Sequence, residues 1–150
     1  MIQLVISDGG RAAAGVKGKV GGDCVTRAIA TATGMEYGEV AAALDALGAK
    51  ERSSKRRRGM KSSSRNGVYR ACYEKLLTSL GWKFTPTMQI GSGCRVHLRE
   101  DELPGGRLVV VLSKHLVAVI DGVLYDNHDP SRRGTRCVYG YYRKVLDSNT

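Results

Sequence analysis

Residues 107–127 have the sequence RLVVVLSKHLVAVIDGVLYDN, in which β-branched and aliphatic residues predominate. Runs of this composition favour extended backbone. The strands predicted from them cover residues 107–113, 115–120 and 122–127. Asp121-Gly122, between the second and third strands, is typical of a two-residue hairpin turn. A further strand is expected within residues 137–145, CVYGYYRKV, so the second half of the chain is predicted to form an antiparallel sheet.

Upstream of this sheet, apolar residues recur every three or four positions, which is the period of a helix that buries one face. The predicted apolar faces consist of Val25, Ala28, Ile29 and Ala32, then Tyr37, Val40, Leu44 and Leu47, then Tyr69, Tyr73, Leu76, Leu77 and Leu80. Asp23 is a suitable N-cap for the first helix and Gly34 a suitable C-cap. Helices followed by strands predict an α+β fold, with N-terminal helices packed on the antiparallel sheet.

The length of 150 residues predicts a single domain over 1–150, with a helical half of about 1–82 and a sheet half of about 83–150. A short apolar opening is suited to an edge strand, and residues 11–22 are expected to form a loop. The opening lacks a basic region before its apolar run, and the longest later apolar run, Leu108 to Leu112, is too short to cross a bilayer. We therefore expect no signal peptide and no membrane span.

The net charge of +10 is concentrated in one place. The segment from Lys50 to Arg65 holds eight basic residues and one acidic residue, so it supplies +7 of the total. We expect residues 50–66 to form a mobile basic loop, which is either simply solvated or binds nucleic acid or an acidic partner. The candidate contact residues are Lys55, Arg56, Arg57, Arg58 and Lys61.

Four cysteines, Cys24, Cys72, Cys94 and Cys137, are too sparse for the disulfide framework of a small secreted domain, so reduced thiols are predicted. Cys94-x-x-His97 has the spacing of half a zinc site. Because no second pair follows at zinc-finger spacing, we predict neither a metal nor a cofactor.

Cys24 opens the first predicted helix, and a helix N-terminus stabilises a thiolate. The neighbouring Asp23 opposes this effect, so a cationic partner such as a protonated histidine is needed. If the hairpin turn forms at 121–122, His115 and Asp126 share one face as diagonal neighbours on adjacent strands, while Asn127 points to the other face. Cys24, His115 and Asp126 are thus candidates for nucleophile, base and orienting acid. Each also has a purely structural interpretation, and His128 is an alternative third residue.

GDCVTRAIATATG at 22–34 and HLVAVIDGVLYDNHDP at 115–130 together resemble the papain-like cysteine peptidase superfamily. The motifs are most similar to those of the bacteriocin-leader-processing peptidases and of small papain-like proteins encoded by bacteriophages. The resemblance implies a papain-like fold and hydrolysis of a peptide or isopeptide bond in a peptide or protein substrate, through a thioester. A cytoplasmic or virion-associated location is expected on this basis.

The same resemblance assigns Cys24 as nucleophile, His115 as general base and then acid, and Asp126 as the orienting carboxylate. It also implies an oxyanion hole built from the cysteine N–H and a glutamine six residues earlier, a position that Gly18 occupies in this chain. Lys17 and Lys19 are candidate replacements for that donor. Two alternatives stay open: a papain-like binding protein with a weak or inactive site, and a basic structural or nucleic-acid-associated protein.

Overall fold

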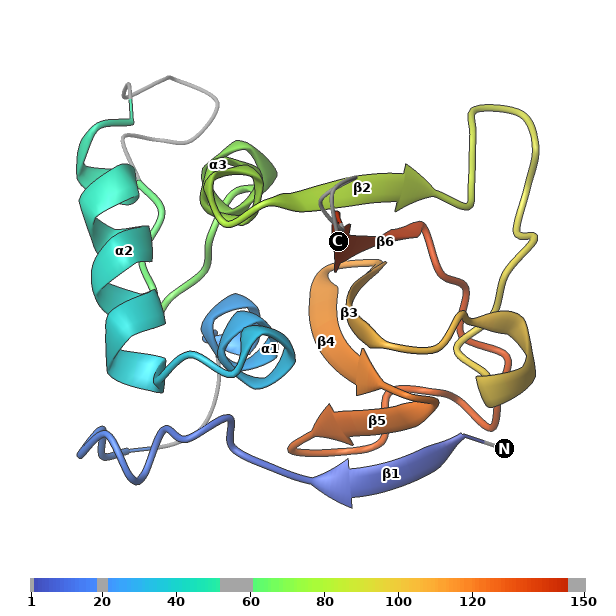
Figure 1. Cartoon of the computed structure of the whole chain (residues 1–150), viewed down its shortest axis with the longest axis horizontal. Coiled ribbons are helices and arrows are strands. Elements are labelled where there is room, and N and C mark those ends of the chain that lie inside the picture. The colour runs from blue at the N-terminus through green and yellow to red at the C-terminus, as the bar shows by residue number, and fades with distance from the viewer. Residues whose placement is uncertain (1, 19–21, 52–60, 146–150) are drawn as a thin grey trace.

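The computed structural model describes residues 2–18, 22–51 and 61–145. Within these residues, three α-helices pack beside a six-stranded sheet, which confirms the α+β prediction (Figure 1). The helices are α1 (Cys24–Thr33), α2 (Tyr37–Ala49) and α3 (Arg70–Ser79). The strands are β1 (Gln3–Ile6), β2 (Trp82–Pro86), β3 (Arg107–Leu112), β4 (His115–Ile120), β5 (Val123–Asp126) and β6 (Gly140–Lys144). No helix among the described residues is both long and apolar enough to cross a membrane.

The strand order is β1-β5-β4-β3-β6-β2, and the pairs from β5 to β2 are antiparallel. The hairpin pairs Ile120 with Val123, as the Asp121-Gly122 turn predicted. The strands of the second half, β3 to β6, thus pair antiparallel as predicted, but the whole sheet is mixed because β1 pairs with β5 in parallel. This orientation delivers the chain after Ile6 to the end of the sheet where α1 begins.

The sheet is also not confined to the second half of the chain. β1 forms one edge, as the apolar opening predicted, and β2 forms the other. Sequence analysis missed β2 because its five residues, WKFTP, are too few to establish a period of two.

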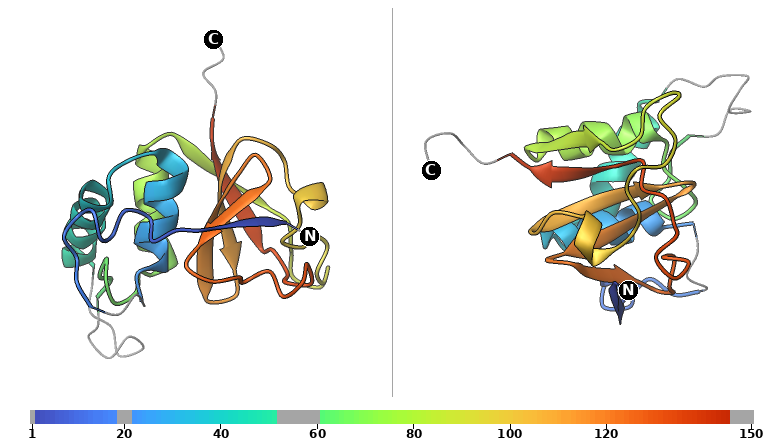
Figure 2. Two further views of the ribbon diagram at one scale, coloured as in Figure 1. Left: turned by 90° about the horizontal axis from the view of Figure 1, so that it is seen from below. Right: turned by 90° about the vertical axis from the view of Figure 1, so that its right-hand side faces the viewer.

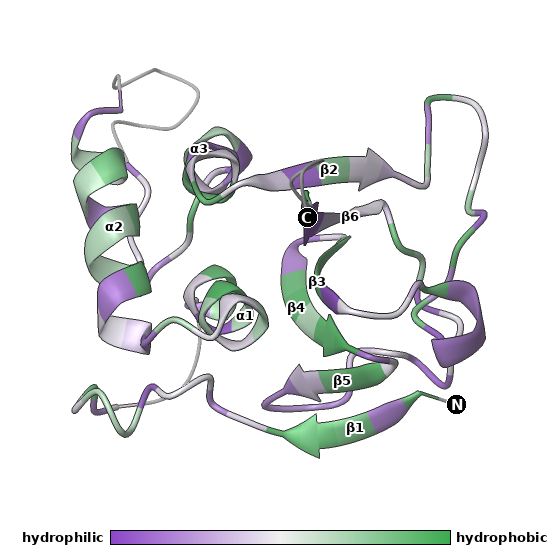
Figure 3. Ribbon diagram, in the orientation of Figure 1, coloured by the Kyte–Doolittle hydropathy of each residue, from purple (hydrophilic) through white to green (hydrophobic). Residues whose placement is uncertain are grey.

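Both faces of the central strands are buried, and the two cores follow the alternation along β3. Val109 and Val111 face the helices, where they join a cluster with Ile29, Leu44 and Tyr142. The opposite-facing cluster consists of Ile2, Leu98, Leu103, Leu108, Val110, Leu112, Val117, Val119, Leu124 and Val138. The segments after β2 and after β5 cover that second face (Figure 2). In Figure 3 the central strands β3 and β4 are coloured largely as hydrophobic, whereas the helices carry both hydrophobic and hydrophilic stretches.

The predicted basic loop divides into two parts. Residues 52–60 lie outside the described residues. The part that follows is ordered rather than mobile, since Ser62 and Ser64 are buried. The Ser64 backbone N–H donates to Asp45 at 2.8 Å, and its carbonyl accepts from the Thr26 hydroxyl at 2.7 Å. These contacts attach the end of the segment to α1 and α2.

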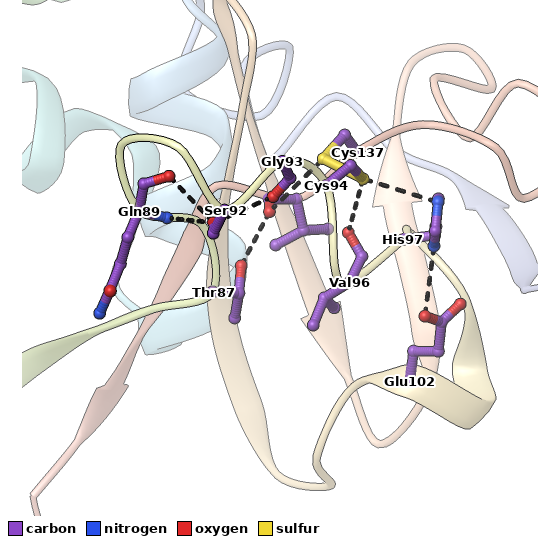
Figure 4. The surroundings of a disulfide bond; sticks show 10 residues. Thr87, Gln89, Ser92, Gly93, Cys94, Val96, His97, Glu102 and Cys137 are labelled. Carbon is purple, nitrogen blue, oxygen red and sulfur yellow. Dashed lines mark hydrogen bonds and ion pairs between the residues drawn. A yellow bond between two sulfur atoms is a disulfide. The ribbon is translucent and has the colours of Figure 1, made fainter.

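The cysteines are not all reduced: Cys94 and Cys137 form a disulfide, while Cys24 and Cys72 are free. The prediction failed because the two cysteines are 43 residues apart and their spacing says nothing about proximity. A β-bridge between His97 and Cys137 brings the two segments together (Figure 4).

Candidate active site

Cys24 is the first residue of α1, and its thiol is half-buried. Asp23 precedes it at the N-cap, as predicted, but the Asp23 side chain makes no capping hydrogen bond. Its buried carboxylate instead accepts from Arg11 at 2.6 Å, from the Tyr37 hydroxyl at 2.8 Å and from Arg27 at 3.0 Å. Consequently the Asp23 charge is neutralised by cations, and its side chain does not occupy the N–H groups of the first helical turn.

His115 and Asp126 meet across the β4–β5 hairpin, where the register places them. His115 Nε2 lies 2.7 Å from Asp126 Oδ2. The other carboxylate oxygen accepts from Arg27 Nη1 at 3.0 Å and from the Asn127 backbone N–H at 2.7 Å. Since only 3 % of the Asp126 side chain is exposed, this carboxylate is fixed in position and orients the imidazole.

The Cys24 thiol completes the row on the other side of His115. Burial raises the pKa of Cys24, but a hydrogen bond with His115, the Leu116 backbone N–H and the charges of His115 and Arg27 outweigh burial, so the pKa is lowered overall. Because Asp126 holds Nε2, Nδ1 is the ring nitrogen left for the thiol.

The pKa of the His115 imidazole changes in the opposite direction. Burial lowers the pKa of His115, but the hydrogen bonds with Asp126 and Cys24 outweigh it and raise the pKa to about 9. Burial likewise raises the pKa of Asp126, while its contacts with His115, Asn127 and Arg27 lower it overall. These opposite shifts favour a thiolate–imidazolium pair at neutral pH.

Arg27 is the residue that sequence analysis missed. Its side chain is 8 % exposed and bridges two carboxylates, with Nε on Asp23 and Nη1 on Asp126. Charges therefore alternate through the interior from Arg11 to Asp23, Arg27 and Asp126. The available signal was an arginine four residues after an aspartate in an otherwise uncharged helix, CVTRAIATAT, where it lies beside the apolar face.

Gly9 packs directly against the backbone of Arg27. A substitution at Gly9 therefore tests how rigidly the backbone of Arg27 is fixed. Gly9 has φ +68°, and an added Cβ would lie 2.8 Å from Arg27 Cα. We expect Gly9→Ala to lower the free energy of unfolding by about 2–4 kcal/mol, through both backbone strain and collision. Gly15→Ala is the matched control, because Gly15 has φ +81° but nothing within 4 Å of the added Cβ.

Urea unfolding of the two glycine variants separates the two costs. The control reports strain alone, of about 1 kcal/mol. Equal losses in both variants would show that the Gly9–Arg27 contact carries no constraint.

Of the two lysines predicted to complete the oxyanion hole, only Lys17 lies among the described residues. Lys17 is exposed and lies outside the recess around Cys24, which is lined by Ser7, Gly9, Cys24, Arg27, Ala28, Thr31, Leu116, Val117, Tyr125 and Asp126. The Lys17 carbonyl accepts from Arg11 and Arg65 and thereby anchors the loop. Lys19 lies outside the described residues, and Gly18 is exposed, with no atom of the described residues within 4 Å of a Cβ added there.

The basic candidates can be placed only in part. Lys55, Arg56, Arg57 and Arg58 lie outside the described residues. Lys61 is exposed and donates to the Ala49 carbonyl at the end of α2 at 3.2 Å. A groove of about 990 Å³ lies at the far end of α1 from Cys24, lined by Met35, Trp82, Arg107 and Lys144 among others, and it has no part in this site.

His128 is close to the site but is not the partner of His115. Its side chain is 58 % exposed, its ring centroid is 5.3 Å from that of His115, and its Nδ1 is 3.9 Å from Asp126 Oδ2. Donor atoms of His115, Asp126 and His128 lie within 4.8 Å of one another, which is close enough to consider a metal. The 2.7 Å contact between His115 and Asp126 is a hydrogen bond, however, and Arg27 already supplies positive charge, so the arrangement favours proton chemistry.

The described residues thus bring a half-buried thiol, an imidazole and a buried carboxylate into one row across α1, β4 and β5, which lie side by side in Figure 1. Comparison with known proteins gives no further assignment, since no protein-family model, curated protein or solved structure matches the chain. The chemistry must therefore come from the residues themselves. A thiolate next to an oriented imidazolium can attack an electrophilic carbon and then transfer a proton to the leaving group.

Proposed function

We propose that this chain is a thiol-dependent hydrolase of papain-like type, which cleaves a peptide or isopeptide bond through a thioester. The observation that carries the proposal is the row from Asp126 through His115 to Cys24, with Cys24 at the start of a helix. Its order and setting match those that the papain-like resemblance implies. Cys24 is far in sequence from the β4–β5 hairpin that carries His115 and Asp126, yet the pKa shifts of the three residues reinforce one another.

In the first half of the reaction, the Cys24 thiolate attacks the carbonyl carbon of the scissile amide. The carbonyl π bond breaks and its electrons move to the oxygen, giving a tetrahedral oxyanion. As this intermediate collapses, His115 Nδ1 transfers its proton to the departing amine and the C–N bond breaks. The products are a free amine and an acyl-thioester on Cys24, with His115 now neutral.

In the second half, neutral His115 removes a proton from water, which attacks the thioester carbon. The C–S bond breaks, the carboxylic acid leaves, and the thiolate–imidazolium pair is restored. Asp126 keeps its hydrogen bond to Nε2 throughout, so the imidazole turns neither away from the thiol nor into the wrong tautomer.

Backbone N–H groups at the start of α1 are the proposed oxyanion donors. The first-turn N–H groups of a helix have no intrahelical acceptor, and the Asp23 side chain does not cap them. The helix dipole adds to their effect. Donors of this kind contribute roughly 10²–10³ in rate each, so the site depends on fewer donors than one with an additional glutamine.

The proposal is tested by the alkylation rate of Cys24 by iodoacetamide as a function of pH, read by peptide mass spectrometry. Thiolate is the reactive form, so a lowered pKa gives reaction well below the ordinary thiol range. His115→Ala should raise the pKa of Cys24. A rise of one pKa unit lowers the thiolate fraction, and with it the alkylation rate at pH 7, by up to about tenfold. Cys72, whose pKa is raised by burial, is an internal control that should stay unreactive.

The same ion pair sets the pH dependence of activity. Attack requires the thiolate, and departure of the amine requires protonated His115. Acyl transfer should therefore rise as Cys24 deprotonates and fall as pH passes about 9, the pKa of His115. A Cys24 that titrates as an ordinary thiol in both the wild type and His115→Ala would overturn the proposal and favour a binding protein.

A further inference from the structure

A second cluster of reactive side chains lies on the opposite side of the sheet from the helices. It contains Cys94, Cys137, His97 and Glu102, in the two segments that cover the second core (Figure 4). Cys94 is exposed, and Cys137 and His97 are half-buried. None of these groups takes part in the proposed hydrolysis.

The backbone places His97 and Cys137 directly opposite each other in an antiparallel pair. Two hydrogen bonds flank the pair, from Leu98 N to Arg136 O at 2.9 Å and from Val138 N to Val96 O at 2.8 Å. This pattern marks a non-hydrogen-bonded pair, in which the side chains of an antiparallel ladder are closest. The position of His97 beside Cys137 is therefore set by the backbone and does not depend on the disulfide.

His97 presents its ring to the sulfur of Cys94. His97 Nε2 is 3.5 Å from Cys94 Sγ. A tetrahedral zinc ion with ordinary Zn–S and Zn–N bonds separates its sulfur and nitrogen ligands by about 3.5–3.6 Å. The separation of 3.5 Å between Cys94 Sγ and His97 Nε2 thus fits two ligands of one zinc ion.

Glu102 holds the other side of the same imidazole. Its Oε1 is 3.2 Å from His97 Nδ1, and its Oε2 is 3.5 Å from Arg99 Nε. A carboxylate on the remote nitrogen of a histidine fixes the ring and its tautomer, as it does for zinc-binding histidines. With Nδ1–H donating to Glu102, the lone pair of Nε2 is directed toward the cysteines.

We propose that, once the Cys94–Cys137 disulfide is reduced, Cys94, Cys137 and His97 bind a zinc ion, with Glu102 positioning His97 and water in the fourth place. A dithiol reductant supplies two electrons, the S–S bond breaks, and the products are two cysteine thiols and the oxidised dithiol. Each thiol loses its proton on binding Zn²⁺. The two thiolates neutralise the ion, and His97 binds as neutral imidazole.

The disulfide and the zinc ion are alternative cross-links at one position. The residues between Cys94 and Cys137 include β3, β4 and β5, and thus His115 and Asp126. The disulfide closes this segment under oxidising conditions, and the metal closes it under reducing conditions. The cover of the second core is therefore held in either environment.

The test uses full-length protein carrying Cys24→Ser and Cys72→Ser, so that the only thiols left are those of Cys94 and Cys137 and the result is independent of the proposed hydrolysis. The protein is reduced with a phosphine, freed of reductant under argon, and given Zn²⁺. Bound metal is counted by elemental analysis after desalting, and the affinity is measured against a chromophoric chelator. Co²⁺ in place of zinc should give a thiolate-to-metal charge-transfer band.

The expected result is about one zinc per reduced chain and none on the oxidised chain. His97→Ala should weaken binding by more than about 100-fold, and Glu102→Gln by about 10–100-fold. His128→Ala, at the other histidine cluster, should change nothing. Circular dichroism of each oxidised variant verifies the fold. Substoichiometric zinc on the reduced chain, equal binding by the oxidised chain, or loss with His128→Ala and not with His97→Ala would each overturn the proposal.

Discussion

Cys24→Ala should abolish the acyl-enzyme burst with the activated ester p-nitrophenyl acetate and reduce turnover by on the order of 10⁴-fold or more. In the proposed reaction every covalent step passes through this sulfur, so no other described group can replace it. Stability should change by less than about 1 kcal/mol, because the side chain is small and only half-buried. The burst amplitude, per mole of chain, and urea unfolding measure the two effects separately.

Cys72→Ala is the reciprocal control, since the other free thiol is buried in the helix-facing core. The residue is 2 % exposed, and its Sγ lies 3.7 Å from the Leu44 carbonyl oxygen. We expect this variant to keep the full burst and to lose about 1–2 kcal/mol of stability. A burst that survives in Cys24→Ala and disappears in Cys72→Ala would contradict the proposed nucleophile.

Local patterns in the sequence were sufficient for the elements that are regular and long enough to show a period. α1 ends at Thr33, and the Gly34 that follows adopts the left-handed φ of 78° expected of a C-cap glycine. The β4–β5 register followed from a single dipeptide, because a two-residue turn leaves one pairing available. β1 was expected at an edge of the sheet. Its parallel direction depends on the position of α1, which no local sequence pattern indicates.

The same division applies to the functional groups. His115 and Asp126 are neighbours because of hairpin register, which a sequence contains. The Arg27–Asp126 ion pair and the Cys94–Cys137 disulfide join segments 99 and 43 residues apart. Such contacts arise from tertiary packing, which no local sequence pattern reveals. A buried arginine is expected only where anionic partners surround it. Of the two carboxylates, Asp23 is near Arg27 in the sequence, whereas Asp126 becomes its neighbour only in the folded chain.

Arg27→Met should cost about 3–5 kcal/mol of stability at pH 7, because it leaves two buried carboxylates without a shared cation. Asp23 keeps Arg11 and Tyr37, and Asp126 keeps His115, so the fold should weaken rather than collapse. Arg107→Met is the matched control. Arg107 also contacts α1, through the Ala32 carbonyl at 3.2 Å, but it is exposed and should cost under about 1 kcal/mol.

The pH dependence distinguishes lost ion pairing from lost packing. Burial raises the pKa values of Asp23 and Asp126, but Arg11 and His115 respectively, together with Arg27, lower them overall. A carboxylate whose pKa is lowered by folding stabilises the folded state at pH values above its unfolded pKa of about 3.9. This stabilisation is lost as the pH falls through the pKa of the folded state. The Arg27→Met deficit in urea unfolding should therefore be largest near pH 7 and shrink toward pH 3.

A positioning role for Arg27 predicts one more effect, which a purely structural role would not produce. Because its charge helps to lower the pKa of Cys24, Arg27→Met should move the alkylation profile of Cys24 to higher pH, while Arg27→Lys should restore part of the shift. A stability deficit that is constant with pH, together with an unchanged Cys24 profile, would show that Arg27 only fills space. The predicted combination would instead tie the buried charges of α1 directly to the reactivity of the thiol at its start.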